Sequence, residues 1–414
     1  MSTGERRLRD ALDTQSDVMS DSSLDFDAMR RQANGIRRRR RIGAGVAAAA
    51  VLAIIAVPTA NLISDDGGDA MPADHDKVLT DEDKQVGDPL QDKQAALDNL
   101  EAFPRGDDPQ IDYVVDGKYH TPDGEALELP TTKGRLAGAT FYKGGAFLAT
   151  DDVDDMSVDK ADATLRRYDA RGEQLSAEPG NARFAVSDDG TRLAWWTWDQ
   201  QASVGTLHSG GGSSMGNGTA TATTGNAYVT PIGFLSGNEV VHNWVVEGGQ
   251  PKVLVTAFGS EPREVGGLDS ATGVSSEEGL IAGQATKTYD AVVVDAASGK
   301  TLWRAPGVLL GSFSPDGKYV LAFSESAEPM PISILDARTG KEVKSFDLSE
   351  EGLGYTTTST VWEDDDSLLL EGYVFAGTDR EDHESALLRL DVNGDVERAS
   401  EIEAGTQWFF APRP

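Results

Sequence analysis

The chain has 414 residues, no cysteine and a formal net charge of −32 at pH 7. The lack of cysteine excludes disulfide bonds, thiolate metal sites and cysteine nucleophiles. So large an excess of acidic residues repels phosphate backbones, which argues against nucleic-acid binding. The composition favours a large acidic domain that its hydrophobic core alone must hold together.

A charge-free segment at residues 42–64 predicts a single transmembrane helix. At about 1.5 Å per residue it is long enough to cross a hydrocarbon core of roughly 30 Å. Cytoplasmic flanks of such spans are rich in Lys and Arg, so we expect residues 1–41 inside the cell and the remainder outside. The orientation follows from five consecutive arginines: Arg37, Arg38, Arg39, Arg40 and Arg41.

A cleaved signal peptide is the alternative to a retained anchor. The 41 residues before the apolar segment are too long for the usual positively charged leader. A cleavage after Ala60 would place Pro58 at the third position back, which fits the small-residue pattern of cleavage sites poorly. We therefore expect a single-pass protein of the plasma membrane with an extracytoplasmic domain.

The two segments that flank the span differ in charge. Residues 1–41 form a basic arm that either docks a cytoplasmic partner or lies on anionic lipid. Residues 65–110 contain 14 acidic and four basic side chains and few large apolar ones. Such a segment cannot bury enough apolar surface to fold alone, so we expect an acidic, flexible stalk with a short helix near residues 91–103.

Residues 111–414 contain strand pairs that repeat about every 45 residues. The best copy is GSFSPDGKYVLAFS, residues 311–324, and five looser copies have their turns at Gly144, Asp189, Gly237, Glu278 and Asp365. A second hairpin follows each pair, as in AVVVDAASGKTLWR, residues 291–304. Four strands per unit at this period are typical of a β-propeller.

The number of units follows from the ends of this region. Six inner strand pairs are visible, and one extra hairpin at residues 112–129 precedes them. We expect residues 405–412, GTQWFFAP, to supply the inner strand that this hairpin lacks. The predicted fold is therefore all-β, a seven-bladed β-propeller preceded by one transmembrane α-helix. The copies are loose enough that six or eight blades stay open.

The repeat motifs resemble known bacterial propellers. FSPDGKYVLAFS is similar to the inner strands of WD40-like and TolB-like propellers, and VVVDAASGKTLWR is similar to the outer hairpin of quinoprotein-like propellers. The order of basic arm, span and exported domain loosely resembles that of membrane-bound anti-sigma regulators. The arm has neither the His nor the Cys of their zinc-binding subclass. These resemblances imply a fold and a layout without implying an activity.

Acidic side chains cluster in the loops between inner pairs and outer hairpins. All these loops open on one face of a propeller, so their carboxylates would form an acidic rim that binds Ca²⁺ weakly or meets a basic partner. The opposite face is acidic too, which favours a merely solvated surface. The candidate rim residues are Asp151, Asp152, Asp154, Asp155, Asp159, Asp379, Glu381, Asp382 and Glu384.

No motif in the chain predicts catalysis. Residues 212–216 fit G-x-S-x-G only by letter, because a Gly/Ser/Thr tract replaces the strand and helix that a nucleophile elbow needs. We assign no catalytic residue, cofactor or metal. The predicted function is a non-enzymatic, membrane-tethered propeller that binds a protein or cell-envelope ligand and passes a signal to a cytoplasmic partner. The alternatives are an extracytoplasmic hydrolase or quinoprotein-like oxidoreductase, and a purely structural envelope scaffold.

Overall fold

The computed structural model describes residues 89–410 apart from several internal gaps. The gaps are residues 116–117, 123, 125, 129–134, 143–145, 153–163, 169–172, 180–183, 200, 212–219, 237, 286–287, 289, 325–330, 375–382 and 405–407. The arginines at 37–41 and the span expected at 42–64 lie outside the described residues. Within the described part, no helix is both long and apolar enough to cross a membrane.

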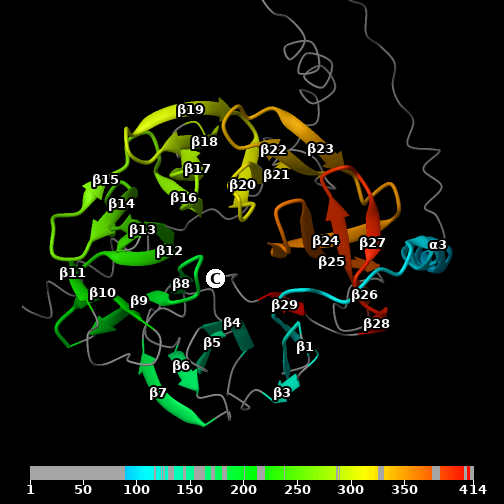
Figure 1. Ribbon diagram of the computed structural model, residues 1–414, viewed down its shortest axis with the longest axis horizontal. Helices are drawn as coiled ribbons and strands as arrows, with labels where there is room; N and C mark the ends of the chain where they lie inside the picture. Colours follow the sequence, from blue (N-terminus) through cyan, green and yellow to red (C-terminus); the bar gives the residue numbers. More distant parts are fainter. Residues whose placement is uncertain are drawn as a thin grey trace, which may run out of the picture. The chain divides into compact units, whose positions relative to one another are not determined.

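The chain divides into two units, Met1–Glu82 and Asp83–Pro414, and the second unit contains every element described below. Its described residues form seven antiparallel sheets, of which six have four strands and one has five. Figure 1 shows the sheets arranged around a common axis with one strand of each nearest the centre. Contacts between inner strands follow the same order, from β8 through β12, β16, β20, β24 and β29 to β4. The fold is therefore an all-β propeller, as the repeat predicted.

The strands are given sheet by sheet, from the innermost strand outward. The first three sheets are β29 (Trp408–Phe410), β1 (Tyr113–Val115), β2 (Lys118–His120), β3 (Ala126–Glu128); β4 (Arg135–Tyr142), β5 (Ala146–Asp152), β6 (Thr164–Tyr168), β7 (Gln174–Pro179); and β8 (Phe184–Val186), β9 (Arg192–Asp199), β10 (Val204–Gly211), β11 (Ala220–Gly225).

The other four sheets follow the same order, and β28 adds a fifth strand to the last of them. They are β12 (Tyr228–Ser236), β13 (Glu239–Val245), β14 (Lys252–Ala257), β15 (Arg263–Glu264); β16 (Ser270–Ser275), β17 (Leu280–Ala285), β18 (Asp290–Asp295), β19 (Lys300–Ala305); β20 (Val308–Phe313), β21 (Tyr319–Ser324), β22 (Ile332–Asp336), β23 (Glu342–Phe346); and β24 (Leu353–Trp362), β25 (Ser367–Val374), β26 (Glu384–Asp391), β27 (Val396–Arg398), β28 (Glu403–Ala404).

The inner hairpins form because their turns satisfy their own polar groups. In the turn between β20 and β21, the Ser314 hydroxyl donates to the Asp316 carboxylate at 2.8 Å and accepts from the Tyr319 N–H at 3.0 Å. Gly317 adopts a φ of +72°, which an L side chain disfavours. The turn between β8 and β9 repeats this arrangement with Ser187 and Asp189.

The hydrophobic core lies between the sheets rather than inside any one of them. Middle strands such as β18 and β21 are buried on both faces, so they are continuously apolar instead of alternating. Val241 and Val255 of one sheet, for example, share a cluster with Ile281 and Val292 of the next. At about 25 cal/mol per Å² of buried apolar surface, these interfaces are the main source of stability.

Two tryptophans that lie between neighbouring sheets also form hydrogen bonds there. The Trp303 Nε1–H donates to the Ala337 carbonyl at 2.8 Å. The Trp362 Nε1–H donates to the Ser312 carbonyl at 3.1 Å. Each bond joins two neighbouring sheets, so the tryptophans set the spacing between sheets as well as filling it.

The two ends of the β-domain share one sheet. Strand β29 pairs antiparallel with β1, with Trp408 opposite Val115 and Phe410 opposite Tyr113. This confirms the prediction that the C-terminal segment supplies the inner strand of the first hairpin. The pairing closes the ring and removes the open sheet edges that would otherwise remain.

The segment expected to be a flexible stalk is docked at its described end. Helix α3 (Pro89–Ala102) buries Ala96 and Leu100 in a core cluster that the β20–β23 and β24–β28 sheets share. Lys93 forms an ion pair with Glu384 at 3.0 Å. The short helix was predicted, but its apolar positions cover the propeller, so the prediction of a free stalk is wrong for residues 89–110. The sequence count of acidic residues could not show this packing.

The closing strand gives a direct test of this architecture. Trp408 is only 3% exposed and packs with Ile111, Leu369 and Leu387. We expect Trp408→Ala to lower the free energy of unfolding by about 3–5 kcal/mol through the cavity it leaves. Leu175→Ala is the control, because Leu175 is 50% exposed and surface changes stay within about 0.5 kcal/mol. Urea unfolding of the full chain measures both, and equal effects would rule out a closing role for Trp408.

Candidate functional site

The propeller has two chemically different faces. The turns within the inner pairs and within the outer hairpins lie on one face, here called the turn face. The connections from second to third strands, and from each sheet to the next, lie on the opposite face, here called the loop face. Antiparallel four-stranded sheets that run outward from the axis impose this division.

Three of the nine predicted rim residues, Asp151, Asp152 and Glu384, lie in the described part of the loop face. Asp154, Asp155, Asp159, Asp379, Glu381 and Asp382 lie outside the described residues. Asp151 and Asp152 end β5, opposite Leu136 and Arg135 of β4. Glu384 begins β26 and is paired with Lys93 of α3. Among the described residues no group of three or more acidic or histidine side chains could hold a metal ion. A rim for Ca²⁺ or a basic partner stays a prediction.

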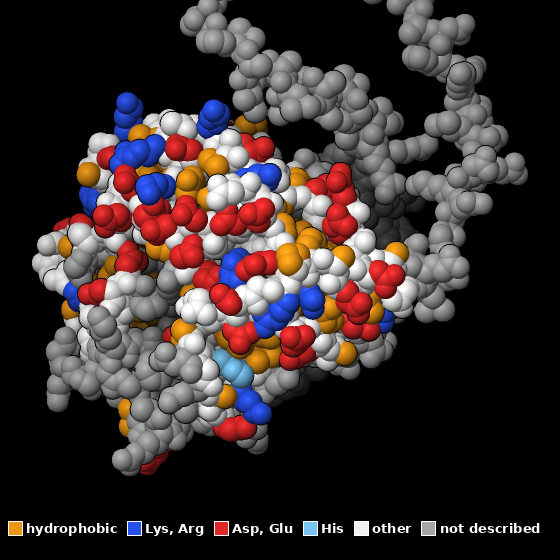
Figure 2. All heavy atoms as spheres, turned by 45° about the vertical axis from the view of Figure 1, so that its right-hand side comes forward, with side chains coloured by type: hydrophobic (Ala, Val, Ile, Leu, Met, Phe, Trp, Pro, Cys, Tyr) orange, Lys and Arg blue, Asp and Glu red, His pale blue; other side chains and the backbone are white. Residues whose placement is uncertain are grey.

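Acidic side chains are widespread on the part of the surface that Figure 2 presents. They occur over several elements, with Lys and Arg between them, instead of gathering at one place. This distribution agrees with a solvated acidic surface whose charge keeps the domain from self-association. The distribution of charge alone therefore marks no binding site on this part of the surface.

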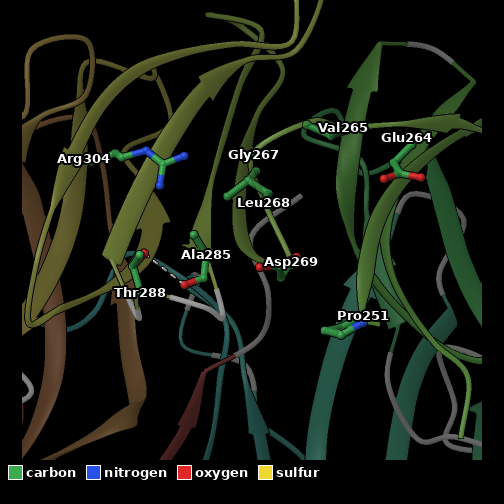
Figure 3. A pocket seen from close by; sticks show the side chains of 9 residues that line it. All are labelled: Pro251, Glu264, Val265, Gly267, Leu268, Asp269, Ala285, Thr288 and Arg304. Carbon is green, nitrogen blue, oxygen red and sulfur yellow. Dashed lines mark hydrogen bonds between the residues drawn. The ribbon is translucent and has the colours of Figure 1, made fainter. Parts of the chain in front are cut away.

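A groove opens on the loop face between the β12–β15 and β16–β19 sheets (Figure 3). Its volume is about 310 Å³, at the lower end of the range for small-ligand pockets. It lies at the connection from one sheet to the next, and both sheets contribute to its wall. The lining residues are Pro251, Glu264, Val265, Gly267, Leu268, Asp269, Ala285, Thr288 and Arg304.

Charges of both signs line this groove. The Arg304 guanidinium lies 3.9 Å from the Asp290 carboxylate, which is too far for a hydrogen bond. On the opposite wall, Glu264 pairs with Lys252 at 2.6 Å. Both pairs are partly exposed, so each contributes little to stability and can rearrange around a ligand. The groove therefore suits a polar ligand that carries both an acidic and a basic group.

Backbone geometry keeps the groove open. Gly267 has a φ of +82°, and a Cβ there would lie 3.2 Å from the Thr301 hydroxyl and 3.8 Å from an Arg304 nitrogen. A side chain at this position would narrow the groove in front of Arg304. The Thr288 hydroxyl and N–H lie 3.5 and 3.1 Å from the Ala285 carbonyl and shape the other wall.

Sequence reasoning did not find this groove. The Gly266–Gly267 pair between β15 and β16 was the available signal, because paired glycines mark a connection with unusual backbone angles. Arg304 sits in the hairpin motif KTLWR, where only its position at the loop-face end of β19 distinguishes it. That position depends on where the strand ends and on which sheet is its neighbour.

The turn face is built for structure. The Asp336 carboxylate accepts from the Thr339 N–H at 2.8 Å and from its hydroxyl at 2.6 Å. Asp295 does the same with Ser298, and these hydrogen bonds hold the pKa of Asp295 below its ordinary value. At Asp316, partial burial acts to raise the pKa. Hydrogen bonds from Lys318 and Ser314 outweigh this effect and hold the pKa below its ordinary value. These aspartates stabilise their own hairpins.

One histidine is buried between the β8–β11 and β12–β15 sheets. His242 is 1% exposed, and its Nε2 lies 2.9 Å from the Thr256 hydroxyl. Burial lowers the pKa of His242 to about 4, because the charged imidazolium would lose its hydration. The ring is neutral at pH 7 and acts as part of the core.

No protein-family model and no curated protein matches this sequence. Matching solved structures include a TolB-type protein from Agrobacterium tumefaciens, 15% identical over 68% of this chain and 86% of the other, with a TM-score of 0.39. A eukaryotic initiation factor is 12% identical over 75% and 99%, with a TM-score of 0.36. The β-propeller domain of Cps50 (Swd1) from Myceliophteria thermophila is 12% identical over 66% and 88%, with a TM-score of 0.43.

These similarities are too distant to carry an argument about function. The class of protein is defined by the seven described sheets themselves and by the closure of the first sheet by β29. The chain is a β-propeller with an open groove on its loop face.

Acidification should destabilise the domain through His242. Its pKa is about 4 when folded and about 6.5 when unfolded, so the unfolded chain binds an extra proton between these values. Stability that is fully present above pH 6.5 is lost as the pH falls toward 4. At 1.36 kcal/mol per pH unit, the loss from this residue is about 2 kcal/mol at pH 5.

His242→Gln isolates this effect, because glutamine can still bond Thr256 but does not titrate. Urea unfolding of both full chains at pH 7.5 and pH 5 measures the difference. We expect the variant to lose about 2 kcal/mol less than the wild type on acidification. Equal losses in the two proteins would show that His242 does not set the acid sensitivity.

Proposed function

We propose that this chain is a non-enzymatic, membrane-tethered, seven-bladed propeller that binds a protein or cell-envelope ligand on its loop face. The observation that carries the proposal is the groove between the β12–β15 and β16–β19 sheets. It combines an open shape, a glycine that leaves room in front of Arg304, and ion pairs that are exposed enough to exchange partners. Concave sites of this kind at a junction of structural units are the usual place for ligands.

The charge of the chain supports the tethered part of the proposal. Residues 1–41 contain ten Arg and seven acidic residues, a net charge of +3, and residues 65–414 contain 27 basic and 62 acidic residues, a net charge of −35. The change of sign coincides with the charge-free segment at 42–64. An acidic domain is repelled by anionic lipid, which favours holding it off the bilayer. The basic arm would then meet the cytoplasmic partner to which a signal passes.

The groove can be tested in cells with a photoreactive amino acid at Thr288. We expect it to form a defined adduct with the ligand when the full chain is irradiated in intact cells. Arg304→Glu should reduce the adduct at least about tenfold, which corresponds to about 1.4 kcal/mol of binding energy. Lys300→Glu is the matched control, because Lys300 lies at the turn-face end of the same strand, β19.

Two results would count against the groove. Equal adduct yields in the Arg304 and Lys300 variants would mean that contact at Thr288 does not depend on the groove. Absence of any adduct in the wild type, with full photoreactive incorporation, would exclude a ligand at this site. Neither result bears on membrane tethering, which has its own test.

The orientation of the tether predicts where the C-terminus lies. A reporter enzyme that works only outside the cytoplasm, fused after Pro414, should be active. Changing Arg37 to Arg41 to glutamate should remove this activity or reduce it severalfold, because the charge bias that sets the orientation is lost. The full-length mass should stay in the membrane fraction. A soluble mature form that begins near Asn61 would instead show a cleaved signal peptide.

A further inference from the structure

The segment between α3 and β1 runs beside the last sheet of the ring before it enters the first. The Gly106 N–H donates to the Arg398 carbonyl at 2.9 Å, and the Arg398 N–H donates to the Pro104 carbonyl at 2.8 Å. Arg105 and Arg398 form a parallel bridge. Residues 103–110, here called the strap, thus add a partial strand beside β27 although almost 300 residues separate them in sequence.

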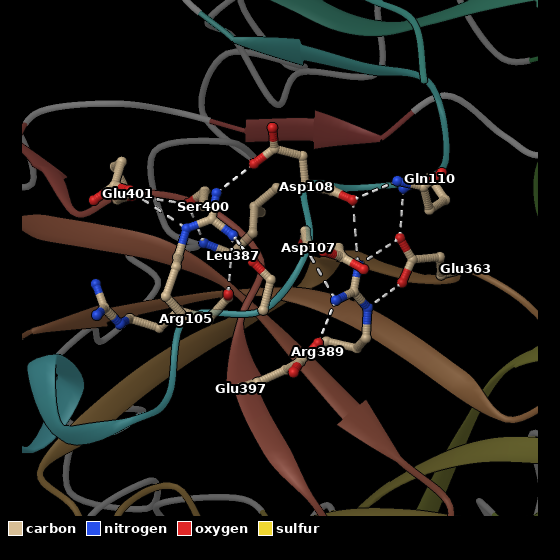
Figure 4. A network of polar contacts seen from close by, with 12 residues as sticks. Arg105, Asp107, Asp108, Gln110, Glu363, Leu387, Arg389, Glu397, Ser400 and Glu401 are labelled. Carbon is tan, nitrogen blue, oxygen red and sulfur yellow. Dashed lines mark hydrogen bonds and ion pairs between the residues drawn. The ribbon is translucent and has the colours of Figure 1, made fainter. Parts of the chain in front are cut away.

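An arginine of β26 also joins the strap to this sheet, in addition to the contacts of Arg105 with Glu401 and of Arg398 with Phe103 (Figure 4). Arg389 of β26 is 13% exposed and forms ion pairs with Glu363 and Glu397. It also donates to the carbonyls of Asp107 at 3.3 Å and Asp108 at 3.4 Å. Hydrogen bonding to Glu363 holds the pKa of Arg389 above its ordinary value, so the charge is permanent. A single cation therefore ties two strap carbonyls to two carboxylates of the sheet.

Glu363 binds the strap at a second point. Its side chain is 3% exposed, so its carboxylate requires close polar partners. Besides Arg389, it accepts the Gln110 N–H at 2.6 Å. Breaking this arrangement would leave a buried charge without its partner, which is costly. The ionic cluster thus binds the strap at two points, Arg389 at the carbonyls of residues 107 and 108 and Glu363 at Gln110. Both points lie immediately before Ile111 and β1.

Helix α3 provides a second, apolar attachment to the same sheet. Leu100 is fully buried against it, and Ala96 lies against Gly352, where a Cβ would come within 3.0 Å. The Asn99 amide donates to the Glu351 carbonyl at 3.1 Å. Helix and strap together fix residues 89–110 to the β24–β28 sheet.

The strand that these residues precede is a weak one. β1 and β29 have three residues each, and their pairing closes the ring. Any force that reaches β1 directly would act on this short pair. Because the chain passes α3 and the strap before it reaches β1, a force from residues before 89 meets the attachments to the β24–β28 sheet first.

We propose that residues 89–110 form a latch that shields the closing strand pair from force applied through the N-terminal side of the chain. The Arg389–Glu363–Glu397 cluster and the buried face of α3 carry the force into the β24–β28 sheet. The β1–β29 pair stays unloaded while the latch holds. The latch would serve an anchored protein, but its existence does not depend on the anchor or on the groove.

Gly106→Ala tests the ionic part of the latch without changing any charge. A Cβ at Gly106 would overlap the Glu397 carboxyl, the flexible end of a side chain that must then leave Arg389. Gly266→Ala is the matched control, because a Cβ there meets nothing within 4 Å and the glycine has no positive φ. Both variants should fold, since neither adds strain to the core.

Hydrogen exchange of the full chain, followed by mass spectrometry, reads out the effect. Gly106→Ala should speed exchange in peptides covering 103–115 and 408–410 at least about tenfold, the equivalent of one charge-assisted hydrogen bond. Exchange in β16 to β19 should not change, and Gly266→Ala should change neither region. Unchanged exchange at 103–115, or an equal increase in every sheet, would overturn the proposal.

A pulling experiment tests the mechanical claim itself. The chain has no cysteine, so Gln85→Cys and Ala297→Cys supply two unique attachment points. Ala297 lies in the exposed turn between β18 and β19, so neither attachment pulls on β29 directly. The wild type should show a first release of at most about 75 Å before the sheets unfold, which is the extended length of 22 residues at about 3.4 Å each. Gly106→Ala should lower the force of this step, and Gly266→Ala should not. If the sheets unfold without a separate first release, or its force is the same in all three proteins, residues 89–110 are not a latch.

Discussion

The packing of sheet against sheet is the constraint on which the rest of this structure depends. Strands such as β18 and β21 are apolar on both faces, so each sheet needs a neighbour on either side. A row of such sheets satisfies this requirement only when its ends meet. The short pairing of β1 with β29 performs that closure, and it brings the two ends of the β-domain together.

Closure by so short a pair explains why other parts of the chain gather around it. Trp408 and Ile111 fill the space beside the β24–β28 sheet. The strap and α3 cover the same sheet from the N-terminal side, through Arg389 and Leu100. Distant segments thus meet beside the closing pair, with both apolar and ionic contacts.

The two faces divide structure from candidate function. On the turn face, carboxylates such as Asp336 are bonded within their own hairpins and stabilise them. On the loop face, the connections differ in length and residue type, and one of them leaves the groove beside Arg304. The turn face is uniform because the same hairpin turns repeat in successive sheets. The loop face carries the groove because its connections differ from sheet to sheet. Binding residues are commonly found on such variable connections.

The sequence by itself determined the all-β class, the repeat and the closing strand, because these depend on local patterns. Copies such as residues 311–324 show strand, turn and strand directly, and GTQWFFAP was the missing strand of an incomplete unit. The tertiary structure alone decided the groove at Arg304, the burial of His242 and the docking of α3. Each of these depends on which side chains face one another across a junction of segments far apart in sequence. The excess of acidic residues predicted a flexible stalk at residues 89–110. The apolar partners of Leu100 lie more than 200 residues away in sequence, so a local count of residue types could not reveal the docking.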